Sequence, residues 1–153
     1  MYQLLKAIHV LAVILFLGNI ITGLFWKRHA DGTNDRAIIA HTLRGIIRAD
    51  NVFTGPSILF LLTFGILAAL RVGLPILGTG WILWSIVLFT LSGVAFGWKV
   101  APLQKQMLRI SEADDGMDWP LYRAKSLEWE LWGIFATLTP IGAVALMTVK
   151  PAL

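Results

Sequence analysis

The chain has no cysteine and few charged residues. Only 14% of its 153 residues are charged and 57% are hydrophobic, whereas roughly 25% of the residues in a soluble domain are charged. The absence of cysteine excludes disulfides, thiolate metal sites and thiol catalysis. With so few charged residues, the protein cannot form the charged, water-exposed surface of an ordinary soluble protein. The composition therefore indicates an integral membrane protein.

Signatures of catalysis and of nucleic-acid binding are missing as well. The sequence contains no Ser/His/Asp set, HExxH motif, Walker loop or GxGxxG fingerprint. No basic face with interleaved aromatic residues lies outside the membrane flanks, so the net charge of +4 fits contact with anionic lipid. We therefore expect a non-enzymatic protein without a nucleic-acid partner.

Four long apolar runs are each close to the ~20 residues that a membrane-spanning helix needs. None of them alternates like a strand of a β-barrel. The spans are predicted at about residues 5–26, 52–71, 81–101 and 127–149. The first run is too long for a signal peptide, and its stronger positive charge follows it, so we expect it to be retained. The sequence thus predicts that residues 1–153 form a single all-α transmembrane domain, a four-helix bundle.

Lysine and arginine lie mostly on one side of these spans. Ten of them fall within residues 27–51 and 99–130, against Lys6, Arg71 and Lys150 on the other side. Because cytoplasmic segments are enriched in lysine and arginine, both long connections are expected in the cytoplasm and both termini outside.

Residues 34–50 have the periodicity of an amphipathic helix. The apolar face is formed by Ile39, Leu43, Ile46 and Ile47, and the opposite face by His41, Arg44 and Arg48. We expect this helix to lie on the cytoplasmic interface, with its basic side toward anionic headgroups or a partner. In the alternative, its apolar face packs under the bundle or against another subunit. Thr33 or Asn34 is expected to cap its start.

One histidine, His9, lies near the outer end of the first span, where an ionisable side chain is costly and often marks a site. Because His29 and His41 lie on the inner side, haem ligation by two histidines of one chain is not expected. The simplest interpretation is a neutral imidazole that is hydrogen-bonded to a hydroxyl or carbonyl between helices. The functional alternatives are haem or copper held by His9 and Met147, or His9 contributed by two chains of a dimer.

The remaining polar and glycine motifs predict packing rather than chemistry. Gly93 and Gly97 form a GxxxG motif, which permits close helix approach within the chain or in a homodimer. Glu128 and Glu130 are two residues apart and point about 200° apart on a helix. Together with Lys99 they predict an ion-pair network instead of an acid–base pair. We assign no catalytic residue and no metal-ligand cluster.

The succession "LLKAIHVLAVILFLGNIITGLFWK", "IIRADNVFTGPS", "GTGWILW" and "LWGIFATLTP" resembles a family of small bacterial integral membrane proteins catalogued as domain of unknown function 2269. The resemblance covers essentially the whole chain and implies a four-helix protein of the bacterial inner membrane. More distantly, "KAIHV" resembles the start of copper-resistance D proteins and of the HemJ type of protoporphyrinogen oxidase. In those families an early histidine is associated with copper or haem, which here carries over only to His9.

Two functions from different classes follow. The first is a non-enzymatic accessory, assembly or interaction subunit, which contacts a second copy or a larger membrane complex through the GxxxG face or the basic helix. The second is a redox or metal-handling protein that binds haem b or copper at His9. We favour the first, because the families with a haem or copper histidine have further histidines at membrane depth that this chain lacks.

Overall fold

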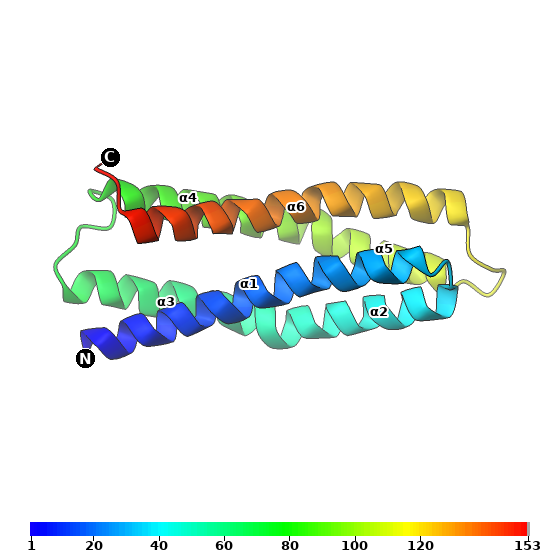
Figure 1. Ribbon diagram of the computed structural model, residues 1–153, viewed down its shortest axis with the longest axis horizontal. Helices are drawn as coiled ribbons and strands as arrows, with labels where there is room; N and C mark the ends of the chain where they lie inside the picture. The colour runs from blue at the N-terminus through cyan, green and yellow to red at the C-terminus, as the bar shows by residue number, and fades with distance from the viewer. Residues whose placement is uncertain (153) are drawn as a thin grey trace.

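The computed structural model describes residues 1–152, and this part of the chain folds into helices without a strand (Figure 1). The α-helices are α1 (Tyr2–Gly32), α2 (Arg36–Ala49), α3 (Gly55–Arg71), α4 (Gly80–Ala95), α5 (Ala101–Ser111) and α6 (Trp119–Val149). Two π-helical turns, η1 (Asp50–Thr54) and η2 (Phe96–Val100), join α2 to α3 and α4 to α5 without a break. The result is four rods of 31 to 36 residues, each long and apolar enough to cross a membrane. The predicted four-helix bundle is confirmed.

The rods are longer than a bilayer's hydrocarbon core. Thirty-one residues at 1.5 Å each span about 46 Å, against a core of about 30 Å. One end of the bundle is formed by residues 27–51 and 99–130, which hold ten of the 13 lysines and arginines. We call this the basic end. The opposite end carries both chain termini (Figure 1), and we call it the termini end.

At the basic end, α1, α2, α5 and α6 pack around an apolar core. Ile39 and Leu43 of α2 and Met107 of α5 are almost completely buried there. The N-cap of helix α6 is Asp118, whose side chain accepts a hydrogen bond from the N–H of Leu121. The basic end therefore has its own protein core and does not depend on lipid for it.

This packing corrects the predicted position of residues 34–50. The segment is helical and amphipathic as expected, but it continues through η1 into α3 rather than lying along the membrane surface. Its apolar face packs on α1 and α5, which is the alternative that the sequence left open, and the basic side chains His41, Arg44 and Arg48 are exposed. The cap is also different, since Asp35 accepts hydrogen bonds from the first free N–H groups.

At the termini end, the four helices separate into two pairs. Helix α1 packs along α3, and α4 packs along α6. Over the described residues, no close backbone contact joins α3 to α4 or α6, or α1 to α4. The two pairs are therefore held together mainly by the basic end and by the middle of the bundle.

The GxxxG motif does not support helix packing within the chain. Gly93 and Gly97 are exposed on the third rod, and a Cβ at either position would meet no described atom within 4 Å. Close approach occurs instead at Gly133 and Gly142 of α6, where a Cβ would lie 3.0 Å from Leu24 and 3.3 Å from Leu88. Of the two alternatives that the sequence left open, close helix packing within the chain is not seen at these two glycines. Its use in a homodimer stays a prediction.

Candidate functional site

A cleft of about 790 Å³ lies between the two helix pairs at the termini end. Helices α1 and α3 form one wall, with residues such as Val13 and Leu61, and α4 and α6 form the other, with Ile82 and Val144. Most of its lining is apolar. Sites that enclose small molecules typically have volumes of about 300–1,000 Å³. This cleft is therefore large enough for a lipid-like molecule or a flat cofactor.

His9 lies on the α1–α3 wall of the cleft and is held against α3. Its Nδ1 lies 2.8 Å from the carbonyl oxygen of Leu61. Because a carbonyl can only accept, Nδ1 carries the hydrogen, and Nε2 of the neutral ring keeps its lone pair. Gly65 makes room for the ring, since a Cβ there would stand 2.8 Å from Nδ1. The predicted hydrogen bond between helices is confirmed.

Met147 lies on the opposite wall of the same cleft, on α6. Ser85, which also lines the cleft, already donates its hydroxyl hydrogen within the protein, with Trp81 O at 2.7 Å and Ala143 O at 3.2 Å. Across residues 1–152 there is no group of three or more His, Asp or Glu that could hold a metal ion. His9 and Met147, on opposite walls, each have an atom suited to bind iron or copper, an imidazole nitrogen and a thioether sulfur.

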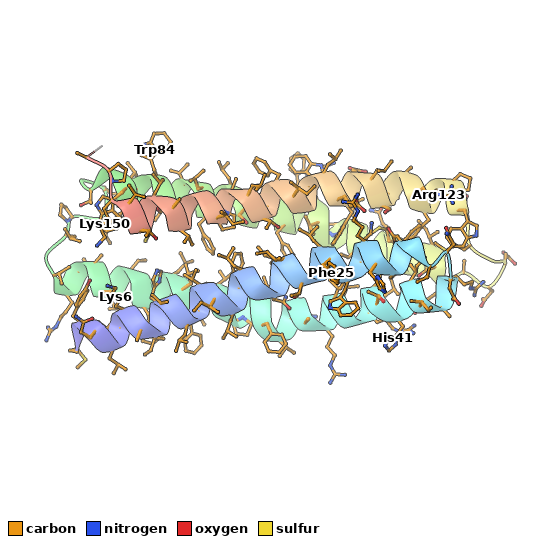
Figure 2. All side chains as sticks on the ribbon, viewed as in Figure 1. Lys6, Phe25, His41, Trp84, Arg123 and Lys150 are labelled. Atoms are coloured by element: carbon orange, nitrogen blue, oxygen red, sulfur yellow. The ribbon has the colours of Figure 1, made fainter. Side chains whose placement is uncertain are left out.

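The charged side chains around the cleft are all cationic. Lys6 of α1 and Lys150, the C-cap of α6, line it from opposite walls, and both lie at the termini end (Figure 2). Every aspartate and glutamate of the chain falls within residues 31–130, at or near the basic end. An apolar cleft edged by lysines, without a carboxylate side chain at that end, is complementary to an amphipathic molecule with an anionic head.

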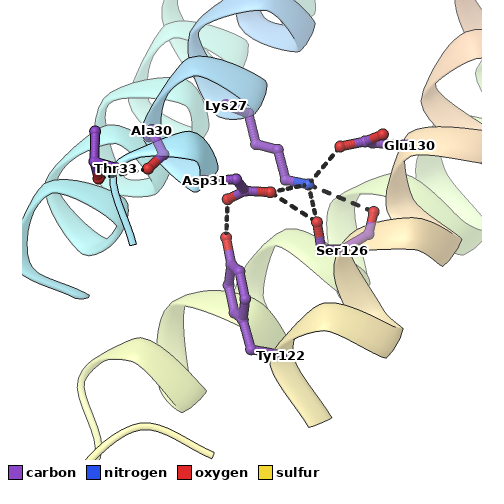
Figure 3. A network of polar contacts seen from close by, with 7 residues as sticks. All are labelled: Lys27, Ala30, Asp31, Thr33, Tyr122, Ser126 and Glu130. Carbon is purple, nitrogen blue, oxygen red and sulfur yellow. Dashed lines mark hydrogen bonds and ion pairs between the residues drawn. The ribbon is translucent and has the colours of Figure 1, made fainter. Parts of the chain in front are cut away.

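A second candidate site is the polar network around Lys27 at the basic end (Figure 3). Lys27 is only 1% exposed, and its Nζ lies 2.7 Å from Asp31 Oδ2 and 3.2 Å from Glu130 Oε1. It also donates to the hydroxyl of Ser126. The hydroxyls of Tyr122 and Ser126 donate to the two oxygens of Asp31, at 2.5 Å and 2.8 Å. The network joins α1 to α6 and leaves its cation fully paired.

Tyr122 belongs to the first turn of α6, before the predicted span begins at residue 127. Burial, followed by the hydrogen bond from its hydroxyl to the Asp31 carboxylate, raises the pKa of Tyr122 above its ordinary value. The hydroxyl is therefore held in its neutral, donating form. This fits a structural role for the network, because its donors and acceptors are paired with one another across α1 and α6.

Only some of these ion pairs could be predicted from the sequence. Lys99 and Glu128 form the predicted pair at 3.1 Å. Glu130 pairs with Lys27 instead, so the two glutamates have different principal partners. The network around Lys27 was missed, although the i,i+4 spacing of Lys27 and Asp31 is a recognised signal for a helical ion pair.

These features define the class as a multi-pass α-helical membrane protein with a cleft between helix pairs and a polar helical extension. The chain belongs to the family described as "Predicted integral membrane protein (DUF2269)", whose model matches residues 3–151. No curated protein and no solved structure matches the chain. The family membership confirms the resemblance drawn from the four motifs. The more distant likeness of "KAIHV" to copper-resistance D and HemJ-type proteins stays a prediction.

Proposed function

We propose that the protein is a non-enzymatic accessory protein of the bacterial inner membrane that holds an amphipathic, anionic molecule in the cleft. The observation that supports this proposal is the combination of a 790 Å³ apolar cleft with Lys6 and Lys150 at its edge. The apolar part of the ligand packs between the two helix pairs, where tight van der Waals contact replaces contact with lipid. Each lysine can form a charge-assisted hydrogen bond with the anionic head of the ligand.

A second candidate is haem b, which has the same general chemistry because its macrocycle is apolar and its propionates are anionic. The hydrogen bond from His9 Nδ1 to the Leu61 carbonyl favours it, since histidines that bind metals usually donate their other ring N–H to a carbonyl or carboxylate. His9 Nε2 and the Met147 sulfur would then hold the iron, and Lys6 and Lys150 would supply positive charge for the propionates. Copper on the same pair would use the same two atoms.

The orientation and the partner surfaces complete the proposal. The positive-inside rule places the basic end in the cytoplasm and both termini outside. The exposed GxxxG face of Gly93 and Gly97 is proposed to contact a second copy of the chain within the membrane. The exposed side chains His41, Arg44 and Arg48 are proposed to contact anionic headgroups or a partner protein.

Purification in a mild detergent, followed by extraction and mass spectrometry, tests the proposal. We expect a stoichiometric anionic amphiphile that is strongly depleted in a Lys6→Gln, Lys150→Gln double variant. Arg71→Gln is the matched control, because it removes a charge at the same end but does not line the cleft. Equal retention in all variants, or no bound molecule, would contradict the proposal.

The absorption spectrum and the metal content of the same preparation identify the ligand. A Soret band that disappears in His9→Ala assigns haem, and bound copper that disappears in His9→Ala assigns copper. Neither signal, together with an extracted anionic lipid, assigns the lipid.

A further inference from the structure

A second and smaller cavity of about 40 Å³ lies in the middle of the bundle, nearer the basic end than the cleft. Its polar lining is centred on Asp50 at the start of η1. Oδ1 of Asp50 accepts hydrogen bonds from Asn19 Nδ2 and from the Thr54 hydroxyl, both at 3.0 Å, and Oδ2 accepts one from Gln104 Nε2, also at 3.0 Å. We call these four residues the Asp50 cluster. The side-chain amide oxygens of Asn19 and Gln104 accept none of these hydrogen bonds and remain available as acceptors.

Trp129 of α6 lines the same cavity, and its indole nitrogen has no hydrogen-bond partner in the protein. The residue is 2% exposed, and among the buried side-chain nitrogen and oxygen atoms of residues 1–152 its Nε1 is the one without a partner. A buried indole N–H normally finds an acceptor. Because Trp129 lines the cavity, a molecule held there could supply the missing acceptor.

Both π-helical turns border this cavity, which is an independent indication of a site. Asp50 and Thr54 are the ends of η1, and Phe96 and Val100 are the ends of η2. A π-turn is rare and is frequently found at a functional site. Here two of them, on different rods, adjoin one small cavity.

An aromatic pair separates this cavity from the cleft. Of the described residues, Phe16 and Phe89 alone line both spaces, and their ring centroids are 5.3 Å apart. The lining is mostly apolar on both sides of the pair, and on the side of the small cavity it includes the Asp50 cluster and Trp129. The two rings therefore lie at the boundary between the two spaces.

We propose that the smaller cavity is an internal water-binding site, in which water accepts the hydrogen bond of Trp129 Nε1–H and donates to the Asp50 cluster. A buried water needs about 10–15 Å³ of such volume and two to four polar partners, so the cavity holds about three waters. Phe16 and Phe89 close the site against the cleft. This site goes beyond the proposed function, because it is built from other residues and does not depend on what the cleft binds.

Nuclear magnetic resonance of the indole N–H groups tests the proposal on the ¹⁵N-labelled protein in detergent. Trp129→Phe assigns the indole resonance of Trp129. In the parent protein we expect a direct cross-peak between Trp129 Nε1–H and water, although the side chain is buried. Absence of this cross-peak, or binding of xenon to the cavity, would overturn the proposal, because xenon occupies dry apolar cavities.

Two alanines of α6 provide a matched pair of variants. Ala136 lines the small cavity and Ala143 lines the cleft; they are 7% and 8% exposed, and each has a carbonyl oxygen in contact with a serine hydroxyl of α4. Ala136→Leu should fill the cavity and abolish the water cross-peak, whereas Ala143→Leu should leave it. A cross-peak that survives in folded Ala136→Leu would show that the water lies elsewhere. If Ala136→Leu does not fold, the parent spectrum and the xenon experiment decide.

Discussion

Replacing Lys27 by methionine should destabilise the protein much more than removing an exposed charge from the same end. Methionine keeps an unbranched side chain as far as Cε but leaves Asp31 and Glu130 without their cation. Removing one partner of a buried ion pair costs roughly 3–5 kcal/mol of unfolding free energy. Because Asp31 and Glu130 are 21% and 23% exposed, water relieves part of this cost, and we expect about 3 kcal/mol, at the low end of that range.

Arg44→Met is the matched control for this prediction. Arg44 also forms an ion pair at the basic end, with Glu112, but the two side chains are 54% and 41% exposed. Pairs of this kind contribute about 0–1 kcal/mol. Reversible unfolding in mixed micelles, followed by circular dichroism, measures both variants under the same conditions.

A triple variant separates lost charge pairing from lost packing. Adding Asp31→Asn and Glu130→Gln to Lys27→Met removes the unpaired charges and should restore most of the stability. Two results would refute the reasoning: a Lys27→Met variant as mild as Arg44→Met, or a triple variant no more stable than the single one.

Three further predictions concern other parts of the molecule. Gly65→Ala should displace the His9 ring, because the new Cβ would lie 2.8 Å from Nδ1, and the ¹⁵N shifts of the imidazole report this; unchanged shifts would contradict it. The Tyr122 hydroxyl, whose raised pKa reflects burial, should stay protonated at about pH 10, where a free tyrosine is half ionised. Its stabilising effect is therefore present below about pH 10 and lost as the pH rises further, and ultraviolet difference titration against Tyr122→Phe checks its ionisation. A cysteine at Gly78 should react with an impermeant thiol reagent outside intact cells and one at Gly116 should not, whereas the reverse pattern would invert the proposed orientation.

The helices themselves could be predicted from the sequence because lipid leaves few alternatives. A backbone in hydrocarbon must satisfy its hydrogen bonds internally, so long apolar runs become helices. The position of residues 34–50 could not be predicted in the same way. An apolar face such as that of Ile39 and Leu43 is satisfied equally by lipid or by protein. Which one it meets depends on α5, whose apolar side is far away in the sequence.

Only part of the candidate site could be predicted from the sequence, because the rest depends on how distant segments pack. His9 could be singled out because an ionisable side chain within a span is unusual. The cleft beside it depends on how the α1–α3 and α4–α6 pairs diverge, and no local motif encodes that divergence. Likewise, nothing near Trp129 in the sequence indicates that its indole N–H lacks a partner in the fold.

The central claim is that the cleft holds an anionic amphiphile, and native mass spectrometry of cleft-filling variants tests it most directly. Val13→Trp places a large ring in the cleft, whereas Leu15→Trp places the same ring on a side chain that is 54% exposed and does not line the cleft. After release from nanodiscs that contain both anionic and zwitterionic lipids, the parent and Leu15→Trp should retain a bound anionic molecule and Val13→Trp should lose it. Retention in Val13→Trp equal to that in Leu15→Trp, or no preference for anionic molecules, would contradict the account.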